Sequence, residues 1–130
     1  MQTRDQKYAA AVYKQIEQIK KKEEKQYKRY GAMAHKLPIL IRTAGLAQAL
    51  EFVNSRGKQE QRQLLADLAV TVGQSDTETL LRQARGVELG EYMRLTQQVM
   101  AALLWYKRFA QSVLGVDASE ATAEDVSDHE

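Results

Sequence analysis

Apolar side chains recur along the first part of the chain at steps of three and four residues, the spacing of one face of an α-helix. The stripe consists of Tyr8, Val12, Ile16 and Ile19. Thr3 and Gln6 stand ahead of it with the spacing of a capping box, in which each residue's side chain bonds the other's backbone. We therefore predict that the first helix begins at this pair.

The first helix is predicted to end near residues 21–24. An unbroken helix would place the charged Glu23 on the apolar stripe. In addition, the run Lys20–Lys22 suits the negative end of a helix dipole, whereas Glu23 and Glu24 suit the positive end of the next one.

Five further segments with helical spacing follow this break. They cover residues 27–44, 46–53, 59–72, 75–86 and 88–114. Pro38 lies inside the first of them, where it kinks the helix or removes one backbone hydrogen bond. Ser75 and Glu78 have the spacing of a helix cap at the start of the fourth.

The last segment is the most apolar and carries two stripes. One contains Leu89, Tyr92, Thr96, Val99, Leu103, Tyr106, Ala110 and Val113, and the other contains Ala102, Trp105 and Phe109. A helix that is apolar on two faces is usually surrounded by others. We therefore predict an all-α fold, a compact bundle of about six helices with a long central C-terminal helix.

The charge is unevenly distributed along the 130 residues. The formal net charge is only +2, from 19 basic and 17 acidic side chains. Residues 1–62 carry 14 basic and 6 acidic side chains (+8), residues 63–116 carry five of each (0), and residues 117–130 carry six acids alone (−6). Such asymmetry indicates a polyanion partner or an acidic tail. We expect residues 1–115 to form a single domain and residues 116–130 to be a disordered acidic tail.

The composition excludes several classes of protein. Without cysteine the chain has no disulfide framework, no thiolate zinc site and no cysteine nucleophile. Its longest apolar run, Val99–Tyr106, is much shorter than the roughly 20 residues that span a membrane. The N-terminal MQTRDQKY lacks the apolar stretch of a secretory signal. We therefore expect a cytoplasmic protein that does not contact a membrane.

Catalytic constellations are nearly absent from the sequence. The two histidines, His35 and His129, have no second ligand at a helical spacing, which excludes an HExxH-type zinc site. The isolated His35 indicates a histidine on a helix surface or at a subunit contact. No glycine spacing matches a phosphate-binding loop. We predict that the protein is not an enzyme and uses no cofactor or metal.

The basic N-terminal half is the most informative feature. Lys7, Lys14 and Lys21 fall within about 40° of one another on a helix, opposite the apolar stripe. A second cluster contains Lys25, Lys28 and Arg29. Residues 25–50 contain no acidic side chain, so they attract phosphate without reading a base sequence. A solvated helix face is the alternative. The aromatic rings near these charges fall mainly on buried stripes, which favours core packing over base stacking.

Two stretches together resemble a known family. They are YGAMAHKLPILIRTAGLAQALEFVNSRG, residues 30–57, and EYMRLTQQVMAALLWYKRFAQSVLG, residues 91–115. In order and spacing they resemble the small helical subunit of the Cmr complex, the type III-B CRISPR effector of bacteria and archaea. The first helix fits by position, so the resemblance covers about residues 4–115.

The resemblance implies a non-catalytic subunit of a six- or seven-helix fold. Copies of it stack as an inner filament, face the subunits that hold the CRISPR RNA and help to accommodate the target RNA in antiviral defence. Its partners are thus other Cmr subunits, its own copies and RNA. The resemblance supplies no list of functional residues, so the basic pattern provides the candidates. We expect phosphate contacts from Lys14, Lys21, Lys25, Lys28, Lys36, Arg42 and Arg108.

Three other functions are alternatives to an RNA-contacting subunit: a structural adaptor, a DNA-binding regulator and a nuclease. A purely structural helical adaptor would use the basic face to meet an acidic protein. A helical DNA-binding regulator needs base-reading side chains, yet the chain has a single asparagine, Asn54. A nuclease needs clustered carboxylates for Mg²⁺, which the sequence does not display. The acidic tail is either an inert solubilising segment or a segment that folds back on the basic residues and competes with RNA.

Overall fold

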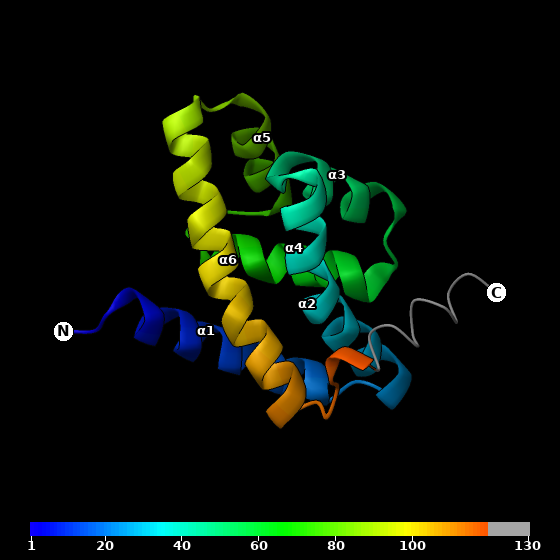
Figure 1. Ribbon diagram of the computed structural model, residues 1–130. Coiled ribbons are helices and arrows are strands. Elements are labelled where there is room, and N and C mark those ends of the chain that lie inside the picture. Colours follow the sequence, from blue (N-terminus) through cyan, green and yellow to red (C-terminus); the bar gives the residue numbers. More distant parts are fainter. Residues whose placement is uncertain (120–130) are drawn as a thin grey trace.

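The structure is a computed structural model that describes residues 1–119, and these residues form six α-helices (Figure 1). The helices are α1 (Arg4–Lys20), α2 (Glu24–Ala44), α3 (Leu46–Arg56), α4 (Gln59–Thr71), α5 (Thr77–Gly86) and α6 (Leu89–Ser112). Within the described part the chain has no β-strand. The predicted all-α fold is therefore confirmed. Residues 120–130, most of the predicted disordered tail, lie outside the described residues.

The predicted start and end of the first helix are both confirmed. Thr3 Oγ1 accepts a hydrogen bond from the Gln6 N–H at 3.1 Å, and Gln6 Oε1 accepts one from the Thr3 N–H at 2.8 Å. α1 ends at Lys20, and α2 begins at Glu24. Across the break the Lys20 ammonium lies 4.4 Å from the centre of the Tyr27 ring, a cation–π contact that joins the two helices.

The cap of α5 is Asp76 and not Ser75, so this prediction was wrong by one residue. Asp76 Oδ1 accepts a hydrogen bond from the Thr79 N–H at 2.8 Å. Hydrogen bonding to the side chain of Thr79, and then to its backbone, holds the pKa of Asp76 below its usual range. Ser75 instead bonds the Thr79 hydroxyl at 3.0 Å. Because serine and aspartate are both strong capping residues, their spacing from the helix did not distinguish them.

The buried stripe of α6 also differs from the predicted one at its start. Leu89 is 73% exposed, whereas Leu95, which the predicted stripes omit, is buried. The buried residues of α6 are Leu95, Val99, Ala102, Leu103, Tyr106 and Ala110. Leu89 is the first residue of the helix, where fewer neighbouring side chains are available to cover it.

α6 packs against α1, α2, α4 and α5, in agreement with its predicted central position. Figure 1 shows α6 running across the molecule, with α1 beside its C-terminal part and α5 beside its N-terminal part. α2 passes through Pro38 without interruption and buries more residues than any other helix. None of the helices described is long and apolar enough to cross a membrane.

A group of polar side chains joins four helices inside the core. The Tyr30 hydroxyl donates to the Asp67 carboxylate at 2.6 Å, and the Tyr106 hydroxyl bonds the side chains of Gln15 and Thr71. Gln15 Nε2 also donates to Thr71 Oγ1 at 3.0 Å. Burial raises the pKa of Asp67, and burial together with the Asp67 charge raises the pKa of Tyr30. The group thereby ties α1, α2, α4 and α6 together.

The chain continues to pack beyond residue 115, the predicted end of the folded domain. Val116 is 1% exposed, and its N–H donates to the Ala110 carbonyl at 2.9 Å. Nε2 of His35, in α2, donates to the Val116 carbonyl at 2.8 Å. His35 is therefore buried and not on the helix surface as predicted, because a segment 81 residues later in the chain covers it. We call residues 114–116 the C-terminal clasp.

Candidate nucleic-acid interface

Lys14 lies on the outer side of α1, opposite the buried stripe, and Lys21 is the residue that caps the C-terminal end of the helix. Both side chains are exposed, and so is that of Lys7. The predicted apolar positions of this helix, from Tyr8 to Ile19, are all buried. A seven-residue step on an α-helix rotates a side chain by only about 20°, so these lysines form one row. The exposure that a phosphate contact requires is therefore present along α1.

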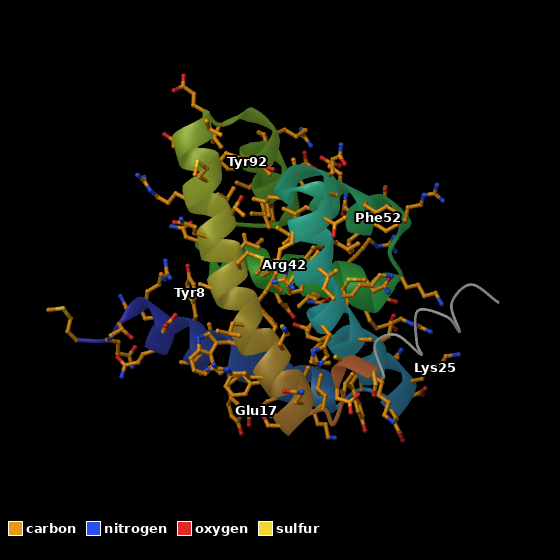
Figure 2. The ribbon with its side chains drawn as sticks, viewed as in Figure 1. Tyr8, Glu17, Lys25, Arg42, Phe52 and Tyr92 are labelled. Carbon is orange, nitrogen blue, oxygen red and sulfur yellow. The ribbon has the colours of Figure 1, made fainter. Side chains whose placement is uncertain are left out.

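Lys25, Lys28, Lys36 and Arg42 are spread over the whole length of α2. Lys25 and Arg42 are exposed and lie about 25 Å apart along the helix axis, and Figure 2 shows them at well-separated places. Lys28 pairs with Glu24 one turn earlier, with 2.9 Å between Nζ and Oε1. The hydrogen bond and charge of Lys28 hold the pKa of Glu24 below its usual range. Part of the Lys28 charge is thus already balanced within the helix.

Arg29 does not belong to the basic surface, although the sequence grouped it with Lys25 and Lys28. Its guanidinium lies 3.2 Å from the Glu60 carboxylate of α4, and the two side chains are only 12% and 9% exposed. The pair therefore connects α2 to α4 inside the bundle. Helical spacing could not reveal this, because the partner lies 31 residues later in the chain.

Arg108 of α6 lies over the ring of Trp105, which belongs to a group of three aromatic rings in contact. Its guanidinium carbon is 5.1 Å from the centre of the Trp105 ring, which stacks on Phe109 with 5.8 Å between ring centres. Phe109 meets the edge of Tyr13 from α1 at 5.3 Å. We call Tyr13, Trp105 and Phe109 the aromatic cluster. Sequence reasoning missed Tyr13, whose position outside the apolar stripe of α1 is the signal that could have revealed it.

The seven candidate residues do not form one compact patch. Lys21, Lys25 and Lys28 lie near the junction of α1 and α2, whereas Arg42 is at the far end of α2 and Arg108 is on α6. Five of the seven make no ion pair with another described residue: Lys14, Lys21, Lys25, Arg42 and Arg108. Dispersed cations of this kind neutralise a phosphate backbone and do not select bases. Among residues 1–119, no group of three His, Cys, Asp or Glu side chains could hold a metal ion.

Known proteins match both the sequence and the fold. A family model described as "CRISPR-associated protein (Cas_Cmr5)" matches residues 4–113. This chain belongs to the Cas_Cmr5 family. The resemblance of residues 30–57 and 91–115 to the small helical Cmr subunits is thereby confirmed. The C-terminal clasp and the acidic segment after it lie outside the matched region.

A curated relative and a solved structure show how far the similarity extends. The "CRISPR system Cmr subunit Cmr5" of Thermus thermophilus is 46% identical over 114 residues, which are 88% of this chain and 98% of the relative. The crystal structure of a CRISPR-associated Cmr5 family protein from Thermus thermophilus matches with a TM-score of 0.81 at 46% identity. The match covers 87% of this chain and 98% of the solved one. The Cmr5-family fold therefore accounts for nearly all of the six-helix bundle.

Proposed function

We propose that this protein is the small subunit of a Cmr complex, the type III-B CRISPR effector, and that it serves antiviral defence there without catalysing a reaction. The observation that carries this proposal is the Cas_Cmr5 family match over residues 4–113. A relative 46% identical over nearly its full length is named as a subunit of the CRISPR Cmr system. The partners are accordingly the other Cmr subunits, further copies of this chain and the RNA of the complex.

Within the complex, the exposed cations of α1, α2 and α6 contact the phosphate backbone of RNA. This part of the proposal is supported by the exposure of Lys14, Lys21 and Lys25 and by the absence of acids from residues 25–50. Cations that meet phosphate release condensed counterions, which gives affinity without sequence preference. The protein then accommodates RNA whose sequence is read elsewhere, by base pairing with the guide.

Copies of the protein stack along the complex as an inner filament. Exposed apolar side chains supply contact area for this packing. Those on the six helices are Tyr13, Ile39, Phe52, Val70, Leu89, Met93 and Leu104. They lie on α1, α2, α3, α4 and α6, so apolar surface is available on several sides of the bundle.

Changing Lys14, Lys21 and Lys25 together to Gln tests the RNA contact. Removing one phosphate contact to a single strand flattens the dependence of log K on log salt by about 0.7, so we expect a slope up to about 2 smaller and weaker binding. Filter binding of a single-stranded RNA over a salt series measures both. The matched control changes three exposed arginines elsewhere, Arg56, Arg82 and Arg94, to Gln. An equal weakening in both variants would show that only the total charge matters.

Purification of the tagged protein from its native host tests the place in the complex. We expect other Cmr subunits and guide RNA to be recovered with it, and mass spectrometry and RNA sequencing identify them. Recovery of neither would contradict the proposal. Ultraviolet crosslinking within the recovered complex then separates the two roles: crosslinks from RNA to α1 or α2 support RNA contact, whereas their absence favours the purely structural adaptor.

A further inference from the structure

The C-terminal clasp attaches the end of the chain to α2. The Val116 carbonyl accepts the hydrogen bond of His35, and Leu114 and Val116 are both buried. The attachment packs closely against Gly31, where an added Cβ atom would lie 3.0 Å from Cγ2 of Val116. The chain therefore leaves the bundle from a fixed point on α2, with Asp117 to Ser119 exposed immediately after it.

This fixed point lies in the middle of the basic residues of α2. Lys28, His35 and Arg42 are seven residues apart, so they fall within about 40° of one another on the helix. Val116, held by His35, is thus about 10 Å along the axis from each of the two cations. Lys36 follows His35 directly, and Lys25 lies one turn before Lys28.

The charges on the two segments are opposite. Residues 117–130 contain six acidic and no basic side chains. Residues 25–50 contain no acidic side chain and four basic ones besides Arg29, which is buried against Glu60. The 11 residues after Ser119 reach at most about 40 Å when fully extended. Every basic position of α2 is therefore within their range. A short tether also gives the acidic segment an effective concentration on the order of millimolar at this surface.

We propose that residues 117–130 dock on the basic face of α2, formed by Lys25, Lys28, Lys36 and Arg42, and screen it from other polyanions until the protein is assembled with its partners. The docking itself follows from the clasp and the charges. The competition with RNA rests on the proposed function. Of the two roles left open for the acidic segment, the position of the clasp favours the competitor over the inert solubilising tail.

Zero-length carbodiimide crosslinking of the full-length protein tests the docking. The reagent joins carboxylates to lysine amines in contact, and mass spectrometry locates the bonds. We expect crosslinks from residues 117–130 to Lys25, Lys28 and Lys36. In a mixture of isotopically labelled and unlabelled protein, these crosslinks should join two segments of the same molecule. The pair Glu24–Lys28, at 2.9 Å, is the internal positive control, and Lys7 near the opposite end of α1 is the control lysine. Absent tail crosslinks, or equal yields at Lys7 and at the α2 lysines, would overturn the docking.

A full-length variant with an almost neutral tail, in which five of the six acids of residues 117–130 are replaced, tests the competition. Its changes are Glu120→Gln, Glu124→Gln, Asp125→Asn, Asp128→Asn and Glu130→Gln. The matched control neutralises five exposed acids elsewhere: Asp5, Glu17, Glu78, Glu88 and Glu91. At about 50 mM salt, where the screening length is long, we expect the almost neutral tail to tighten binding of a single-stranded RNA about 3- to 10-fold and the control to do so much less.

Equal tightening in the two variants would overturn the competition, because net charge alone would then explain it. Different results would contradict the docking of residues 117–130 and the proposed RNA contact. If no form of the protein or its complex binds RNA, the proposed RNA contact is wrong, while the crosslinks still decide whether the acidic segment docks on α2.

Discussion

Asp67 of α4 shows how two opposing effects set the ionisation of a single residue. Tyr30 and Gln63 donate hydrogen bonds to its two carboxylate oxygens at 2.6 Å and 2.9 Å, which stabilises the charged form. Burial destabilises the charged form, and it is the larger effect, so the pKa of Asp67 lies above the ordinary value of 3.8. The ionised carboxylate is therefore less stable in the folded protein than in the unfolded chain.

The exchange Asp67→Asn should consequently change the pH dependence of stability. The pKa of Asp67 is higher in the folded protein than in the unfolded chain, so protonated Asp67 contributes its full stabilisation of the fold below pH 3.8. This stabilisation is lost as the pH rises through the pKa of the folded state. We expect the free energy of unfolding of the wild type, relative to the variant, to fall over this range and then to level off. Urea denaturation at a series of pH values measures the difference.

Asp76, whose pKa is lowered by its cap to Thr79, provides the opposite case. Its stabilisation is present above pH 3.8 and is lost as the pH falls through the lower folded pKa. The wild type should therefore lose stability relative to Asp76→Asn on acidification. Parallel pH profiles for the two variants would contradict the assignment of burial as the dominant cause at Asp67.

At the scale of helices and segments, long-range contacts hold elements in place. The buried pair of Arg29 and Glu60 connects α2 to α4, and the aromatic cluster connects α1 to α6. The C-terminal clasp is held on α2 by His35 and by the space that Gly31 leaves open. A methyl group at residue 31 would crowd Val116, so the clasp would have to shift to accommodate it.

The exchange Gly31→Ala should therefore destabilise the protein, although alanine is the better helix former. The helical preference favours alanine by up to about 1 kcal/mol, but relief of a 3.0 Å contact in a packed core costs about 1–3 kcal/mol. We expect a net decrease of about 1 kcal/mol in the free energy of unfolding, measured by urea denaturation.

Two further variants make the test of the clasp specific. Gly90→Ala in α6, where an added Cβ would meet nothing within 4 Å, should be neutral or stabilising. In a Val116→Gly background, which removes the crowded atoms, Gly31→Ala should become neutral or stabilising as well. A decrease of the same size in both backgrounds would show that the clasp is not the cause.

At the scale of the whole molecule, the surface differs from one helix to the next. Cations line the outer sides of α1 and α2, while α3 exposes an aromatic ring. Phe52 is 52% exposed and borders a shallow hollow with Ala47, Gln48, Glu51 and Ser55. Glu51 also pairs with Arg85 of α5 at 2.6 Å, which holds the rim of this hollow. The exposed ring of Phe52 therefore supplies apolar surface for a protein contact.

The exchange Phe52→Ser should affect assembly much more than the stability of the fold. Because the ring is half exposed, we expect the free energy of unfolding to fall by about 1 kcal/mol or less. Recovery of Cmr partners or of further copies of the chain in a pull-down should fall much more, since an aromatic residue at an interface often carries a large share of the binding energy. Gln48→Ser, a polar change one turn earlier, is the control. Unchanged recovery with Phe52→Ser would exclude this hollow from the interfaces.

Local sequence determined the helices and most of their buried faces. Side chains three and four residues apart share a face of a helix whatever surrounds it, so the stripe of α1 and the break before Glu24 could be predicted from spacing and charge alone. The family was recognisable for a similar reason, because residues 30–57 and 91–115 preserve a pattern in order and spacing.

Only the tertiary structure decided which helical residues meet across the bundle. Helical spacing placed Arg29 with the surface lysines of α2, yet it forms a buried ion pair with Glu60 of α4. The same spacing placed His35 on the helix surface, yet Val116 covers it. Tyr13 falls outside the stripe of α1 but reaches Phe109 on α6. Periodicity fixes the direction of a side chain around its own helix, whereas the neighbour it finds depends on how helices distant in the sequence pack. For that reason the sequence alone determined the charge of each segment. The position of the C-terminal clasp in the structure was needed to infer that the acidic segment docks on the basic face of α2.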